Sequence, residues 1–259
     1  MKRILVASDL SERSDHAIRR AVRLAEAHGA SVTVAYVVDS ALPAYIAAHV
    51  QKQATITLQT KLNDCVPDPK LKTDIQVPVG DVVTEVGEVA EQVMADLLIL
   101  GVHRRRLFFD KIKETTMERL IRHSRQPVLA VVNPAEAPYA HLLAAVDLSP
   151  ACARAVRLAK ALLPQARIGL FHAHDVSFHK EAERDYATWL AVAGLDDDLP
   201  PPMFVEARPV DAVDQIMKDN DHDLLVMGAH TRSNVGRFLL GGFSSDMIRN
   251  PPSDILVAK

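Results

Sequence analysis

The chain of 259 residues contains an internal sequence repeat of two copies. The segment ILVASDLSERSDHAIRRAVRLAEAHGASVTVAYVVD recurs as LLAAVDLSPACARAVRLAKALLPQARIGLFHAHD, so that Asp9 corresponds to Asp147. Further on, ADLLILGVH recurs as HDLLVMGAH. Two copies are too few for a solenoid, which needs at least three repeats. We therefore predict two domains, residues 1–133 and 139–259, joined by a proline-containing linker.

Each copy alternates short apolar runs with amphipathic stretches. The run Ile4–Ala7 is typical of a strand buried on both faces, and a helical pattern follows from Ser11 to Gly29. Such alternation predicts an α/β fold, with two tandem Rossmann-like domains that each contain a five-stranded, mostly parallel sheet with helices on both faces. Ligands of such sheets bind at the carboxyl ends of the strands. In the first copy we expect strands near 4–7, 31–38, 75–79, 97–100 and 128–132, and helices over 11–29, from 43 onward, over 82–93 and over 115–123.

The composition is that of an ordinary globular protein, with 48% hydrophobic and 24% charged residues. It excludes long disorder and a disulfide scaffold. Cys65 and Cys152 are its two cysteines, which suits a reducing cytoplasm. No apolar run approaches the roughly 20 residues of a membrane span, and the run after MKR is too short for a signal peptide. A net charge of −3 gives no argument for nucleic acid or membrane as a partner.

The most informative loop of the second copy is GAHTRSNVGRFLLGGFSSDMIRN. Glycines followed by two serines at a helix start offer backbone N–H groups, hydroxyls and a positive dipole end to an anion. The loop has neither the lysine of a Walker A motif nor a G-x-G-x-x-G pattern. Glycines before a helix are more often turn and cap residues, so this feature alone leaves phosphate binding open.

The combination of motifs is more specific than any one of them. A first strand that ends in Asp-x-Ser, a D-L-L-x-M-G strand and a later glycine loop resemble the universal stress protein family, and the resemblance covers nearly the whole chain as two tandem domains. It implies that a G-x2-G-x9-G-[S/T] loop holds the phosphates and ribose of ATP. It also implies that the aspartate ending the first strand and a residue ending the second strand hold the adenine.

Two positions of the glycine motif match in the second copy, and two depart from it. Gly228 is the first glycine and Gly241 the third, whereas Thr231 replaces the middle glycine and Gly242 replaces the final serine or threonine. The resemblance places Asp147 on the adenine side and Ala173 at the end of the second strand. The predicted site for ATP, with Mg²⁺ as an optional companion, is therefore Asp147, Leu148, Ala173, Gly228, His230, Thr231, Gly241, Gly242, Phe243 and Ser244.

The first copy departs further from the motif. Arg104 replaces the middle glycine and Glu114 the third, and only Thr115 matches at the end. A carboxylate at Glu114 would repel phosphate oxygens, so we expect this domain to be structural or regulatory. Residues 1–134 carry a net charge of +2 and residues 135–259 carry −5. The basic run Arg104–Arg106 is either a solvated loop or a site for an anion or a partner.

We find no pattern that indicates catalysis or a metal. Ser11 and Ser149 are expected to cap helices by accepting backbone N–H groups, and Cys152 is expected to be packed on an apolar helix face. His172 and His174 project from one face of a strand, which is metal-competent spacing, but one histidine at the ligand edge is the simpler interpretation. We predict no metal site and no catalytic residue.

Three functions are compatible with these features. The leading hypothesis is a stress-related cytoplasmic protein, not an enzyme, that binds adenine nucleotide mainly in its second domain. The alternatives are a nucleotide-free protein that binds a partner or small ligand, and a slow ATPase. The resemblance also implies that the two domains pair through their last strands, 128–132 and 255–258, and that two chains can form a homodimer.

Overall fold

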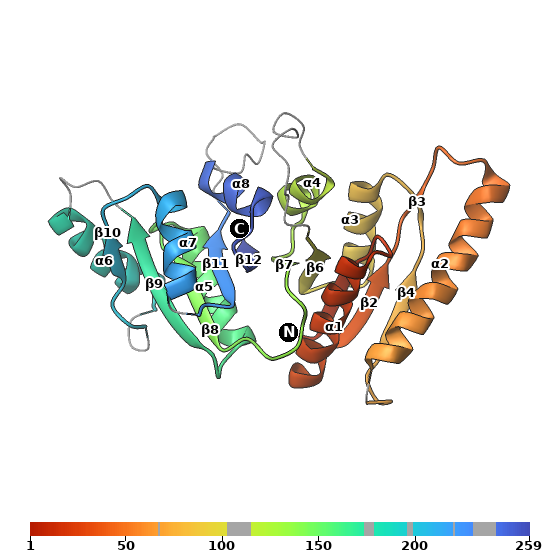
Figure 1. The fold of residues 1–259 in the computed structure, drawn as a ribbon, viewed down its shortest axis with the longest axis horizontal. Helices are drawn as coiled ribbons and strands as arrows, with labels where there is room; N and C mark the ends of the chain where they lie inside the picture. Colours follow the sequence, from red (N-terminus) through yellow and green to blue (C-terminus); the bar gives the residue numbers. More distant parts are fainter. Residues whose placement is uncertain (67, 103–114, 174–178, 196–198, 220, 230–241) are drawn as a thin grey trace. The chain divides into compact units, whose positions relative to one another are not determined.

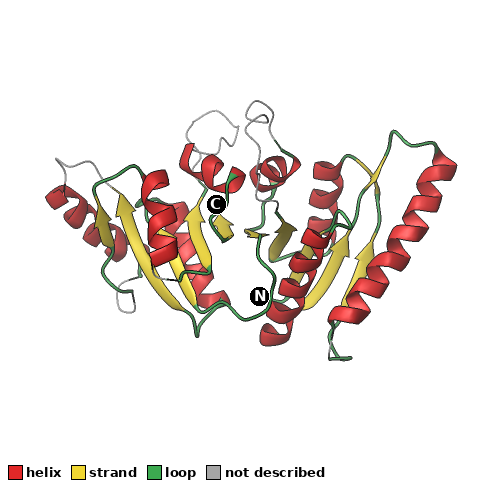
Figure 2. Ribbon diagram, in the orientation of Figure 1, coloured by secondary structure: helices red, strands yellow, loops and turns green. Residues whose placement is uncertain are grey.

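The computed structural model describes residues 1–66, 68–102, 115–173, 179–195, 199–219, 221–229 and 242–259. The chain divides into two compact units, residues 1–138 and 139–259, here called the first unit and the second unit. Each unit consists of parallel strands covered by helices (Figures 1 and 2).

The first unit contains a five-stranded parallel sheet in the order β7-β6-β1-β2-β4. Helices α1 and α2 pack against each other on one face of it, and α3 and α4 pack against each other on the other face (Figure 1). A two-stranded parallel pair, β3-β5, lies beyond the sheet. The strands are β1 (Arg3–Ala7), β2 (Ser31–Ala35), β3 (Val38–Asp39), β4 (Thr73–Gln76), β5 (Val79–Gly80), β6 (Leu97–Gly101) and β7 (Val128–Val131), and the helices are α1 (Glu12–His28), α2 (Ala44–Cys65), α3 (Val82–Gln92) and α4 (Thr116–His123).

The second unit repeats this arrangement with a parallel sheet in the order β10-β9-β8-β11-β12. Its strands are β8 (His141–Ala145), β9 (Arg167–Ala173), β10 (Met203–Val205), β11 (Leu224–Gly228) and β12 (Asp254–Ala258). Its helices are α5 (Pro150–Leu162), α6 (His179–Ala193), α7 (Pro209–Asp219) and α8 (Gly242–Arg249). The α/β fold class with two Rossmann-like repeats is confirmed.

The central strands are buried along their length because both sheet faces are covered. Strands β7, β11 and β12 consist entirely of buried residues, as their nearly continuous apolar sequences predict. Helix α1 ends as expected at Gly29, which adopts a left-handed conformation with φ of 60°. Local sequence signals and tertiary packing therefore agree in these elements.

The expected helix caps differ between the units. Ser149 accepts a hydrogen bond from the N–H of Cys152 at 3.0 Å, as predicted. Ser11 occupies the equivalent N-cap position, but its side chain accepts no backbone N–H, and its hydroxyl donates to the Asp9 carboxylate instead. The capping prediction for Ser11 is therefore wrong. The Asp9 carboxylate is a charged acceptor two residues before Ser11, and the Ser11 hydroxyl is oriented towards it.

One close backbone contact recurs in both units, where the fourth strand of the five-stranded sheet, in chain order, meets the first helix. A Cβ atom added to Gly228, at the end of β11, would lie 2.4 Å from the backbone nitrogen of Cys152. In the first unit, a Cβ added to Gly101 would lie 2.5 Å from the carbonyl oxygen of Arg13. Both glycines are therefore required for packing, whatever ligand they contact.

We expect Gly228→Ala to destabilise the second unit by about 1–3 kcal/mol, because the new methyl group overlaps helix backbone that no side-chain rotation can move. The measurement is urea unfolding followed by circular dichroism, which senses both units, together with the fluorescence of Trp189, the single tryptophan, which lies in α6 of the second unit. The matched control is Gly87→Ala in α3, where an added Cβ meets no atom within 4 Å. That change should be neutral or stabilise by up to about 1 kcal/mol. An unchanged midpoint for Gly228→Ala would contradict the packing role.

Candidate functional site

The second unit contains a cavity of about 390 Å³ at the carboxyl ends of β8, β9 and β11. The start of α8 and the first residue of α7 complete its wall. This is the edge at which open parallel sheets bind their ligands. We call it the second-unit cavity, and it is lined by Ala145, Val146, Asp147, Phe171, His172, Ala173, Pro209, Met227, Gly228, Gly242, Phe243 and Ser244.

The turn after β8 supplies the acidic side of this cavity. Asp147 accepts the N–H of Ser149 at 2.9 Å, which fixes its carboxylate beside the start of α5. Between them, Leu148 has a φ of 61°, a conformation that leucine rarely adopts. Its counterpart Leu10 has a φ of 64°. Both units therefore use the same strained turn to present a carboxylate at the strand end.

His172, near the end of β9, lines the cavity from the side of the second strand. Its Nδ1 lies 2.7 Å from the carbonyl oxygen of Val146. A carbonyl only accepts, so Nδ1 carries the hydrogen, and the ring is oriented by this bond. The ring also meets Phe204 edge-on, with centroids 6.0 Å apart. The prediction that one histidine of the pair borders the ligand edge agrees with this placement, while His174 lies outside the described residues.

The start of α8 supplies the polar side of the second-unit cavity. Ser244 is only 3% exposed, yet it lines the cavity. The first turn of α8 carries no acidic residue, so the positive end of the helix dipole is not neutralised there. A buried hydroxyl beside a helix start is well suited to an anionic group.

The structure brings together six of the ten residues predicted for the nucleotide site. Asp147, Ala173, Gly228, Gly242, Phe243 and Ser244 all line the second-unit cavity. Leu148 lies in the adjacent turn without lining it. His230, Thr231 and Gly241 lie outside the described residues.

Sequence reasoning missed several lining residues, notably Phe171, Met227 and Pro209. The first two are apolar residues at or near strand ends. The rule that ligands bind at those ends could have singled them out.

The first unit has a corresponding first-unit cavity of about 370 Å³. Asp9, Tyr36, Gly101 and Met117 line it, at positions equivalent to Asp147, His172, Gly228 and Ser244. The fold has thus produced a cavity at the same place in both units. The two cavities differ in chemistry because the side chains at equivalent positions differ.

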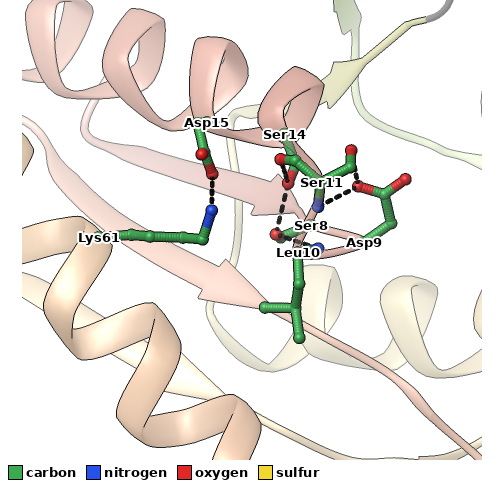
Figure 3. A network of polar contacts seen from close by, with 7 residues as sticks. All are labelled: Ser8, Asp9, Leu10, Ser11, Ser14, Asp15 and Lys61. Atoms are coloured by element: carbon green, nitrogen blue, oxygen red, sulfur yellow. Dashed lines mark hydrogen bonds and ion pairs between the residues drawn. The ribbon is translucent and has the colours of Figure 1, made fainter.

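Figure 3 shows how the first-unit carboxylate is held. The N–H of Ser11 donates to Asp9 at 3.0 Å, and the hydroxyl of Ser11 also donates to it. Ser8 donates to Ser14 at 2.9 Å, and the N–H of Leu10 donates to Ser8 at 3.1 Å. Nearby, Lys61 of α2 pairs with Asp15 of α1.

These contacts change the acidity of Asp9. Burial raises the pKa of its carboxyl, but hydrogen bonds from Ser11 and Ser14 and the charge of Arg13 outweigh this, so that the pKa lies below its ordinary value. Asp9 is therefore a carboxylate at neutral pH.

The first turn of α4 contains a capping box that the sequence reading missed. Thr115 accepts the N–H of Glu118 at 3.1 Å, and the carboxylate of Glu118 accepts the N–H of Thr115 at 2.8 Å. The T-x-x-E spacing is a recognised signature that could have predicted it. Glu114 and the basic run Arg104–Arg106 lie outside the described residues.

The described residues contain no group of three or more His, Cys, Asp or Glu side chains that could hold a metal ion. Burial raises the pKa of the Cys152 thiol to about 12, which makes it inert, as expected for a packed cysteine. No helix in the described ranges has the length and apolarity needed to cross a bilayer.

Comparison with known proteins identifies a family. The model of the universal stress protein family matches residues 1–132 and 138–259. A universal stress protein from Archaeoglobus fulgidus DSM 4304 is similar in structure, with a TM-score of 0.79, 19% identity, and coverage of 99% of this chain and 98% of that one. A protein from Pseudomonas aeruginosa PAO1, described as functionally unknown, gives a TM-score of 0.69 at 17% identity, with coverage of 100% and 92%. A comparison with curated proteins gives no significant match.

We expect Asp9→Asn to reduce the stability of the first unit at neutral pH and to have less effect in acid. The folded-state pKa of Asp9 is lowered, so its contribution is present above the unfolded value of about 3.8 and is lost as the pH falls through the folded value. The measurement is the urea midpoint by circular dichroism between pH 7 and pH 3, with the exposed residue Asp64 changed to Asn as control. A difference from wild type that stays constant over this range would contradict the assignment.

Proposed function

The chain belongs to the universal stress protein family, and on that premise we propose that its second unit binds an adenine nucleotide, while the first unit is structural or regulatory. The observation that carries the proposal is the second-unit cavity. At the carboxyl edge of a parallel sheet, it combines a carboxylate, a histidine oriented by a hydrogen bond, and a helix N-terminus whose first turn contains no acidic residue.

The proposed adenine position lies between β8 and β9. Phe171, His172 and Ala173 give this part of the cavity an apolar and aromatic wall, and Asp147 stands at its edge. A purine ring combines apolar faces with N–H donors, so a wall of this kind with one carboxylate matches it. The family resemblance assigns the same strand ends to the adenine.

The proposed phosphate position lies at the start of α8. The hydroxyl of Ser244 and the backbone of Gly242 border the cavity there. The N-terminal end of α8 adds a positive dipole without an acidic residue to oppose it. The volume of about 390 Å³ falls within the range of ~300–1,000 Å³ usual for small-molecule sites.

We propose binding rather than catalysis. In the second-unit cavity the described residues include no serine, cysteine or threonine paired with a base, and the Nδ1 of His172 already donates to a backbone carbonyl. Slow ATP hydrolysis, with Mg²⁺ held near Asp147, is the enzymatic alternative. Thr231 and Gly242, which depart from the family motif, favour instead a nucleotide-free protein that binds another small ligand or a partner.

The direct test is identification of the bound ligand. We expect mass spectrometry of the purified, denatured protein, or calorimetry with added ATP, to show about one adenine nucleotide per chain. ATP should also change the fluorescence of Trp189, whose Nε1–H donates to the carbonyl oxygen of Ser149 near the cavity. Absence of copurified nucleotide together with no binding at millimolar ATP would refute the proposal. Conversion of ATP to ADP that is lost in Asp147→Ala would establish the enzymatic alternative.

Substitution at the helix start locates the site. We expect Ser244→Ala to weaken ATP binding about tenfold, because a buried hydroxyl that bonds to a charged group contributes roughly 1.5–3 kcal/mol. Gly241→Glu, which places a carboxylate at the third motif glycine, should abolish binding. Thr188→Ala on α6, whose hydroxyl donates to the carbonyl of Arg184, is the control and should leave affinity unchanged. Full affinity in both Ser244→Ala and Gly241→Glu would place the site elsewhere.

A cytoplasmic location and the pairing of domains or chains stay predictions from the sequence. Gel filtration of the purified protein at several concentrations would measure whether chains associate.

A further inference from the structure

The two cavities differ most at the helix that begins beside each of them. Residues 115–118 of the first unit correspond to residues 242–245 of the second, at a constant offset. Glu118 therefore stands where the second unit has Ser245, and Met117 stands where it has Ser244. The first turn of α4 contains an acidic residue, and the first turn of α8 contains none.

Glu118 is an unusually placed carboxylate. It is 1% exposed, and it accepts hydrogen bonds from the N–H of Thr115 at 2.8 Å and from the Thr115 hydroxyl at 3.1 Å. Carboxylates are seldom buried so completely unless they are hydrogen-bonded. Here the bonds come from the helix start itself, which is the part of a helix that attracts anions. Glu118 thus fills, within the chain, the role that a ligand's anionic group would fill.

The rest of the first-unit cavity is consistent with this role. Its lining at α4 consists of Thr116, Met117 and Leu120, and the only charged side chain in its described lining is Asp9. Among the described lining residues, a phosphate group entering here would meet the carboxylate of Asp9 and no lysine, arginine or histidine. Glu118 itself does not line the cavity, but it directly follows the lining residues Thr116 and Met117 in the first turn of α4. In the second-unit cavity the same region presents Gly242 and Ser244 among the described residues.

We propose that Glu118 determines the charge selectivity of the first-unit cavity. Its carboxylate acts as a built-in anion at the start of α4 and excludes phosphorylated ligands from a cavity that the fold otherwise forms in both units. The contrast with the second unit rests on the proposed nucleotide site there. The exclusion of phosphate from the first unit does not rest on it.

The test removes the charge while keeping the cap. In Glu118→Gln the side-chain oxygen still accepts from the N–H of Thr115, and Glu118→Ser introduces the residue of the second unit. The probe is inorganic tripolyphosphate, measured by calorimetry on the full chain. Trp189 fluorescence is recorded in parallel, because that residue lies in the second unit and its Nε1–H donates to Ser149 there. We expect both variants to gain a binding event that leaves the fluorescence unchanged and is at least about tenfold tighter than any such event in wild type.

Glu91→Gln is the matched control. It removes one negative charge from the same unit at an exposed residue that pairs with Arg125 on the surface, so it should gain no binding event. Folded Glu118 variants without increased tripolyphosphate affinity would overturn the proposal. The proposal would also be overturned if the wild-type protein bound two equivalents of ATP and only one of them changed the fluorescence of Trp189.

The reverse exchange covers the case in which the Glu118 variants do not fold. Ser245→Glu should lower ATP affinity at least about tenfold relative to Ser245→Gln, and equal affinity of these two variants would contradict the proposal. If wild type binds no ATP at all, the nucleotide site of the second unit is refuted, and the tripolyphosphate result with Glu118→Gln still decides the role of Glu118.

Discussion

The close contact between a strand-end glycine and the backbone of the first helix is the constraint on which both units depend. Because a Cβ at Gly101 or Gly228 would overlap that helix, the helix start is held directly against the carboxyl edge of the sheet. The connecting turn then has to be tight, and Leu10 and Leu148 adopt positive φ angles to make it. An aspartate just before each leucine is thereby presented at the ligand edge. Backbone packing therefore forms the cavity, whichever ligand it binds.

Because packing forms the cavity in both units, the difference between the units has to lie in the side chains placed around it. Tyr36 in the first unit stands in the place of His172, and Met117 stands in the place of Ser244. Met117 in place of Ser244 removes a hydroxyl that can donate a hydrogen bond to an anionic ligand, and Tyr36 in place of His172 changes the wall at the position proposed for the adenine. A duplicated domain can lose one ligand in this way while its core is unchanged. The first unit is then available for a structural or regulatory role.

The repeat and the alternation of apolar runs were sufficient to predict the fold, because strand burial and helix periodicity are local properties of the sequence. The helix end at Gly29 was predictable for the same reason. The hydrogen bond from Ser11 to Asp9 was not, because it depends on where the folded turn places the Asp9 carboxylate relative to the Ser11 hydroxyl. The strand ends predicted Asp147 and Ala173 as neighbours, but the orientation of His172 by the Val146 carbonyl requires the three-dimensional structure. The capping box at Thr115 could have been read from its spacing.

The net charges of the two halves point the opposite way from the proposed anion preference. The half with an excess of two positive charges contains the cavity that we propose excludes phosphate, and the half with an excess of five negative charges contains the one that we propose accepts it. Screening resolves the difference, since exposed charges act over only about 8–10 Å at physiological ionic strength. Glu118 is 1% exposed and directly follows the lining residues Thr116 and Met117, so its charge is screened less than an exposed one. The position of Glu118 therefore outweighs the sum of the surface charges, and local geometry rather than composition decides which cavity accepts an anion.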